Sequence, residues 1–136
     1  MSDKELLYIE EDGSLSFGNH KLDEKAKMDD FKYNGDLLKC KTYKPMTKLE
    51  KNGMFVYESV PGTSVYHFTE TDAGVEFEVE GSEDAQITVG LAEDTEYEIV
   101  VAGTSAGKMK TNLGGKLSFN AELAGSGKMK VSIKKA

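Results

Sequence analysis

Apolar and polar residues alternate along most of this chain, and that is the pattern of β-strands that bury one face and expose the other. The alternation is clearest in the last third, at residues 97–101, 117–123 and 129–133, with a single apolar position at Met109 between them. Glycine-rich segments, which supply the positive φ of tight turns, separate these stretches. We therefore predict four short strands joined as a meander over residues 97–134.

Two Asn-Gly pairs, at residues 34–35 and 52–53, predict two-residue hairpin turns, because both central residues of such a turn must tolerate positive φ. Further alternating segments lie at 6–10, 15–17, 64–69, 75–80 and 87–91. In all, about ten to twelve strands are expected at spacings near ten residues. This pattern predicts an all-β fold, an antiparallel β-sandwich of the jelly-roll type, formed by residues 1–136 as a single domain.

One stretch, residues 23–28, is compatible with a helix, and we expect at most one short helical segment there. The period-2 pattern also predicts which side chains fill the core. They are Phe55, Tyr66, Phe68, Phe77, Val79, Ile87, Val89, Ile99, Val101, Leu117, Phe119, Val131 and Ile133.

The net charge of −7 is unevenly distributed along the 136 residues. Residues 52–107 carry 12 acidic residues and no lysine, whereas residues 108–136 carry 7 lysines and one glutamate. Every basic residue is lysine, so the chain lacks the guanidinium group that reads guanine edges and phosphates with two hydrogen bonds. We expect no nucleic-acid partner, because the overall field also repels phosphate.

The single cysteine, Cys40, can form no intramolecular disulfide, which fits a reducing compartment and a buried structural thiol. Residues 1–5 contain no basic segment of a signal peptide, and the apolar run 6–9 is too short to follow one. No run reaches the ~20 apolar residues of a membrane span. The default expectation is a cytoplasmic protein that does not contact a membrane.

No cofactor or metal site is expected. The segment 103–108, Gly-Thr-Ser-Ala-Gly-Lys, lacks the spacing and the following hydroxyl of a phosphate-binding loop, and it reads as a hairpin connection. Four acidic clusters could supply Ca²⁺ ligands, although acidic turn residues are also ordinary at a surface. They lie at residues 10–12, at Glu70 with Asp72, at 83–84, and at 93–94 with Glu96.

His20 and His67 are far apart in the sequence and carry no catalytic signature, so structural roles are favoured. Exposed aromatic rings are a common platform for sugars, and Tyr33, Tyr43, Tyr57 and Tyr66 are the candidates. Of these, Tyr33 and Tyr57 are the predicted ligand-binding residues.

The segments 52–62 (Asn-Gly-Met-Phe-Val-Tyr-Glu-Ser-Val-Pro-Gly) and 107–117 (Gly-Lys-Met-Lys-Thr-Asn-Leu-Gly-Gly-Lys-Leu) carry a resemblance. The chain resembles a group of small bacterial proteins labelled "endosialidase", a label that implies hydrolysis of polysialic acid. Sialidase-type sites clamp the substrate carboxylate with arginine, and this chain has none, so we expect no enzymatic activity. The C-terminal strands also resemble accessory β-sandwich modules of polysaccharide-active enzymes.

Two functions follow as expectations. The first is a non-catalytic assembly protein that forms a homo-oligomer through an acidic face, Glu76, Glu78, Glu80 and Glu98, and a basic face, Lys108, Lys110, Lys116, Lys128 and Lys130. Opposite charges on neighbouring strands of one molecule would explain the same pattern without assembly. The second is a carbohydrate-binding module, related to sialic acid or to other polysaccharides, with a glycan as partner.

Overall fold

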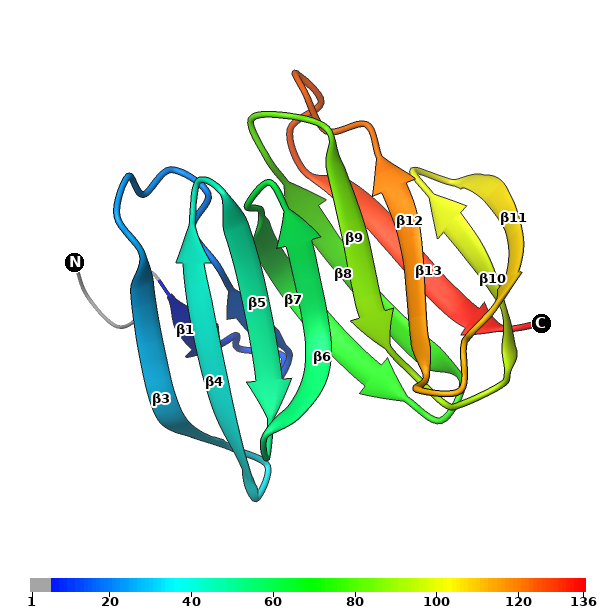
Figure 1. Cartoon of the computed structure of the whole chain (residues 1–136), viewed down its shortest axis with the longest axis horizontal. Coiled ribbons are helices and arrows are strands. Elements are labelled where there is room, and N and C mark those ends of the chain that lie inside the picture. Colours follow the sequence, from blue (N-terminus) through cyan, green and yellow to red (C-terminus); the bar gives the residue numbers. More distant parts are fainter. Residues whose placement is uncertain (1–5) are drawn as a thin grey trace.

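Two antiparallel β-sheets, one of seven strands and one of six, pack face to face in the computed structural model, which describes residues 6–136 (Figure 1). The all-β sandwich predicted from the sequence is confirmed. The seven-stranded sheet has the order β1-β2-β7-β8-β13-β10-β11 and the six-stranded sheet the order β12-β9-β6-β5-β4-β3. Thirteen strands are present in the described part of the chain, slightly more than the pattern predicted.

The strand bounds are as follows. The seven-stranded sheet contains β1 (Leu7–Ile9), β2 (Leu15–Phe17), β7 (Ser64–Thr71), β8 (Gly74–Glu80), β10 (Glu96–Val101), β11 (Thr104–Lys110) and β13 (Met129–Lys135). The six-stranded sheet contains β3 (Ala26–Tyr33), β4 (Asp36–Tyr43), β5 (Met46–Lys51), β6 (Met54–Val60), β9 (Ala85–Gly90) and β12 (Lys116–Ala121). The first five residues, on which the signal-peptide argument partly rests, lie outside the described residues.

The jelly-roll character lies in the second half of the chain. Strand β8 pairs with β13, β9 with β12, and β10 with β11, so this half is a long antiparallel hairpin wrapped across both sheets. Strand β13 therefore lies between β8 and β10. The four strands predicted over residues 97–134 exist, but the predicted meander is wrong, because β12 belongs to the other sheet and β13 pairs back onto β10.

The first half is a sequential meander, β3 to β6, in the six-stranded sheet. Its two predicted Asn-Gly turns are confirmed, with φ of 51° and 84° at Asn34 and Gly35 and 52° and 79° at Asn52 and Gly53. Residues 23–28, where at most one short helical segment was expected, form no helix, because β3 starts at Ala26 and pairs with β4, Ala26 opposite Thr42. A helix of six residues is marginal alone, whereas strand pairing satisfies the same backbone groups and half-buries Ala26 and Met28.

The core lies between the sheets and centres on four aromatic rings, Phe17, Tyr57, Phe68 and Phe77, whose centroids lie 5.3–5.7 Å apart in successive pairs. Three of the four ring pairs pack edge-on, and the Phe68–Phe77 pair is tilted; such contacts add to the hydrophobic stabilisation. The predicted core residues are buried except Phe55, Tyr66 and Val101, which are only partly covered.

Candidate functional site

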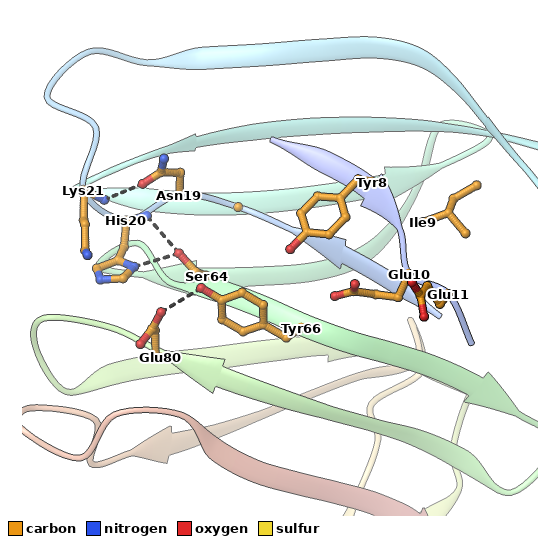
Figure 2. Close-up of a pocket in the computed structure, with 11 residues that line it drawn as sticks. Tyr8, Ile9, Glu10, Glu11, Asn19, His20, Lys21, Ser64, Tyr66 and Glu80 are labelled. Carbon is orange, nitrogen blue, oxygen red and sulfur yellow. Dashed lines mark hydrogen bonds between the residues drawn. The ribbon is translucent and has the colours of Figure 1, made fainter. Parts of the chain in front are cut away.

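A groove of about 590 Å³ lies on the outer face of the seven-stranded sheet, at the end that carries β1 and β2 (Figure 2). We call it the tyrosine groove, because the rings of Tyr8 and Tyr66 line its length. Its walls come from the end of β1, the loop after β2, and strands β7 and β8. The lining residues are Tyr8, Ile9, Glu10, Glu11, Gly18, Asn19, His20, Lys21, Ser64, Tyr66 and Glu80.

Strand alternation explains why these side chains face outward. In β7, Val65 is completely buried in the core, so its neighbours Ser64 and Tyr66 project from the opposite face. Tyr8 stands in the same relation to the buried Leu7 of β1. The register places Ser64 opposite Glu80 on β8, which brings the glutamate into the same groove.

The loop after β2 forms the upper wall and is held by hydrogen bonds to the sheets. His20 Nδ1 and Ser64 Oγ are hydrogen-bonded at 2.7 Å, a contact drawn as a dashed line in Figure 2, and the backbone N–H of Asn19 donates to Thr42 Oγ1 at 2.8 Å. Gly18 permits this approach, because it has φ of +90° and a Cβ there would lie 2.6 Å from the Thr63 carbonyl oxygen. Burial lowers the pKa of His20, a shift that the nearby charge of Glu80 opposes, so its neutral form is favoured.

Tyr66 is fixed from two sides. Its hydroxyl donates to Glu80 Oε1 at 2.7 Å, and Lys128 Nζ lies 4.0 Å from the ring centroid, within cation–π range. Burial and then the hydrogen bond to Glu80 raise the pKa of the Tyr66 hydroxyl, so it stays a donor at neutral pH. The groove thus offers an oriented aromatic ring beside a carboxylate.

A second cluster beside the groove brings Ser14, Asp12 and Glu10 close to His67 and resembles a nucleophile–base arrangement. Ser14 Oγ lies 3.1 Å from His67 Nδ1, but it also donates to Asp12, and the Asp12 carboxylate lies 3.4 Å from that same ring nitrogen. A catalytic triad needs the carboxylate on the other nitrogen, where Glu10 Oε2 is 3.8 Å away. The cluster instead holds a β-bulge, because His67 has φ of 54° and its backbone N–H donates to Ser16 Oγ.

The two tyrosines predicted to bind ligand have different positions. Tyr57 is completely buried, and its hydroxyl lies 2.8 Å from Thr63 Oγ1, so its predicted place on a ligand-binding surface is wrong. A hydroxyl partner six residues along the chain makes its burial possible. Tyr33 lines a separate cavity at one end of the sandwich and donates to the Gly13 carbonyl at 2.7 Å.

The acidic and basic faces proposed for assembly are neighbours within one sheet. Glu78 lies opposite Lys130 on β13, and Glu98 lies opposite Lys108 on β11. Glu76 forms an exposed ion pair with Lys134, with 2.9 Å between Oε1 and Nζ. Of the other assembly residues, Lys110 lies opposite Glu96 and Glu80 lines the groove. Lys128 Nζ lies over the Tyr66 ring. Lys116 belongs to the other sheet, where its Nζ lies 4.5 Å from the Phe55 ring centroid.

From the sequence, Tyr66 is both a predicted core residue and a candidate sugar-binding tyrosine, and Tyr8 is not singled out. The predicted core position of Tyr66 is wrong because the bulge at His67 changes the alternation: Phe68 turns inward while Tyr66, two residues earlier, stays outside. A histidine with positive φ leaves no local sequence signature. Tyr8 faces outward because its neighbour Leu7 is buried, and only the short alternating run Leu7–Ile9 could have suggested this.

Other candidate chemistry does not converge. Among residues 6–136, no three His, Cys, Asp or Glu side chains are placed to hold a metal ion. Cys40 is completely buried, and desolvation raises the pKa of its thiol to about 12, so it stays protonated at neutral pH. The described part of the chain contains no helix long and apolar enough to cross a membrane.

Comparison with protein-family models, with curated proteins and with solved structures finds no match to this chain. The resemblance to the small bacterial proteins therefore rests on short sequence segments alone. The functional proposal is based on the geometry of the groove.

Proposed function

We propose that the chain is a non-catalytic carbohydrate-binding module whose tyrosine groove holds a neutral polysaccharide segment. The observation that carries the proposal is the combination of two aromatic rings, Tyr8 and Tyr66, with hydrogen-bonding side chains in one open groove. Sugar rings present apolar faces that stack on tyrosine and hydroxyl groups that need polar partners. Glu80, Ser64 and Asn19 offer both acceptors and donors at the groove wall.

The charge around the groove favours a neutral sugar over sialic acid. Among the residues that the structure describes, three carboxylates, Glu10, Glu11 and Glu80, line it, against one lining lysine, Lys21, and the nearby Lys128 above the Tyr66 ring. A sialic acid carboxylate would enter this field against electrostatic repulsion. Neutral hydroxyl groups instead donate to the same carboxylates.

Binding without hydrolysis fits the roles that these carboxylates have. Glycoside hydrolysis needs one carboxyl group to donate a proton to the leaving oxygen. Here Glu80 accepts a hydrogen bond from Tyr66, and Glu10 accepts one from Ser16, at 2.7 and 2.5 Å. Both side chains act as fixed acceptors that orient a ligand.

A glycan array followed by titration of the best neutral oligosaccharide tests the proposal. Tyr66→Ala should weaken binding at least tenfold, because it removes the stacking ring, and Tyr66→Phe should weaken it less. Tyr43→Ala, a half-buried tyrosine of the other sheet, is the matched control and should leave affinity unchanged. An array without hits, or equal losses for Tyr66→Ala and Tyr43→Ala, would contradict the proposal.

Self-association is a second candidate, and one observation favours it. The two ends of the seven-stranded sheet carry opposite charge: β11, exposed at every residue, contains Lys108 and Lys110, whereas the turn after the uncharged edge strand β1 contains Glu10, Glu11 and Asp12. These edges lie at opposite ends of the molecule (Figure 1), so the basic edge of one copy could pair with the acidic edge of the next.

Light scattering over a salt series tests this candidate. Assemblies should dissociate as salt screens the edge charges, and Lys108→Glu with Lys110→Glu should abolish them at low salt. Lys130→Glu changes a charge in the middle of the sheet and serves as the control. A monomer at every salt and protein concentration would end the hypothesis.

A further inference from the structure

A second cavity, of about 410 Å³, lies between the two sheets at the end of the sandwich where the β3–β4 turn meets the β1–β2 turn. We call it the end cavity. It differs from the tyrosine groove in having an apolar floor, formed by the buried side chains of Leu38, Leu49, Val56 and Phe68. Its size lies within the range of small-molecule sites, and a cavity with an apolar floor and a few polar groups is their usual form.

Two polar contacts join the sheets at the mouth of the end cavity. Tyr33 in β3 donates to the Gly13 carbonyl in the β1–β2 turn, and Lys51 in β5 forms an ion pair with Glu70 in β7, at 2.7 and 3.0 Å. Both contacts lie at the surface, where water can replace them at small cost in free energy. The mouth can therefore open without disturbing the core.

The rim of the end cavity is acidic. Asp12, Asp36 and Glu70 line it, and Lys51, the one lysine of residues 6–136 in the lining, is already paired with Glu70. Asp36 accepts a hydrogen bond from the Asn52 amide and Asp12 one from Ser14, with His67 Nδ1 3.4 Å from the other Asp12 oxygen. Within the described part of the chain, the Asp12 and Asp36 carboxylates on the rim have no lysine partner, and their field attracts a cation and repels an anion.

We propose that the end cavity binds a small amphipathic cation, with its apolar body on Leu49, Val56 and Phe68 and its ammonium group between Asp12 and Asp36. This site is separate from the tyrosine groove and does not depend on the glycan proposal. The same field excludes fatty acids and other amphipathic anions of similar size.

Three probes with one apolar body and different charge test the proposal on the full chain. The probes are 2-phenylethylammonium, neutral 2-phenylethanol and the anion 3-phenylpropionate, each titrated to about 10 mM because small ligands gain little beyond the cost of association. We expect the cation to shift the methyl NMR signals of Leu38, Leu49 and Val56, and to bind at least tenfold more tightly than the anion.

Variants locate the binding. Asp36→Asn should weaken cation binding at least threefold and leave 2-phenylethanol unchanged, whereas Glu122→Gln, an exposed acid outside the cavity lining, should change neither. Val56→Phe should fill the cavity and abolish all binding; if it fails to fold, Asp36→Asn still decides the question. Equal affinity for cation and anion, shifts confined to other residues, or no shift at 10 mM would overturn the proposal.

Discussion

Replacing Tyr57 by phenylalanine should destabilise the protein measurably, because the hydroxyl belongs to a buried network. Tyr57 Oη and Ser59 Oγ both lie 2.8 Å from Thr63 Oγ1, and Thr47 Oγ1 donates to the Thr63 carbonyl at 2.7 Å. These side chains are fully buried. The substitution removes one hydrogen bond and leaves the Thr63 hydroxyl with one partner fewer, where water cannot replace the lost group.

The expected loss is about 1–2 kcal/mol in the free energy of unfolding, which combines one net hydrogen bond with the cost of an under-satisfied buried hydroxyl. Urea denaturation at pH 7 measures it, with an unchanged dependence on denaturant showing that the unfolded state is the same. Tyr33→Phe is the matched control: it removes a hydroxyl that donates at the surface, so the loss should stay below about 0.5 kcal/mol.

The two variants also decide between the buried and the ligand-binding role of Tyr57. A surface tyrosine would tolerate loss of its hydroxyl about as well as Tyr33 does. Equal and small effects of both substitutions would refute the buried network and return Tyr57 to the list of ligand-binding candidates.

Three further predictions concern the thiol, a glycine contact and an ion pair. Because burial raises the pKa of Cys40 to about 12, the unfolded thiol ionises first, and it should contribute a fall of about 1 kcal/mol in stability between pH 9 and 10; denaturation of Cys40→Ala should show a fall that is smaller by that amount. Gly90→Ala should lower the free energy of unfolding by about 1–3 kcal/mol, because its Cβ would lie 2.4 Å from the Phe55 carbonyl oxygen. In the same assay Gly114→Ala, whose Cβ would lie 3.3 Å from the Asn112 side chain, should lower it by less than about 0.5 kcal/mol. Lys134→Ala should change stability by less than about 1 kcal/mol, because its ion pair is exposed, and a larger loss would contradict that reading.

Local patterns predicted the elements of this fold well. The Asn-Gly turns and the period-2 alternation depend on neighbouring residues, and both are visible in the sequence. Long-range effects account for the errors. The bulge at His67 reverses the expected face of Tyr66, and Thr63 gives Tyr57 a buried partner that the alternation of β6 could not reveal.

The candidate groove could not be predicted for the same reason. Tyr8, Ser64 and Glu80 come from three strands whose order depends on how β7 pairs with both β2 and β8. No spacing rule in the sequence relates them. The sequence offered four tyrosines as candidates, and it is the register that brings one of them, Tyr66, beside Tyr8 in the proposed groove and buries Tyr57.

The jelly-roll pairing explains where the segregated charges go. It places the acidic strands β8 and β10 beside the basic strands β11 and β13, so Glu78 lies opposite Lys130 and Glu96 opposite Lys110. Cross-strand pairs of opposite charge favour this register over alternatives that would place acids side by side. Glu80 lies beyond Val79 and Met129, the last residue pair of β8 and β13. It lines the tyrosine groove together with Glu10 and Glu11, which follow β1. Three acidic residues that the basic strands do not cover, Glu10, Glu11 and Glu80, therefore line the tyrosine groove, which is why we propose a neutral ligand for it.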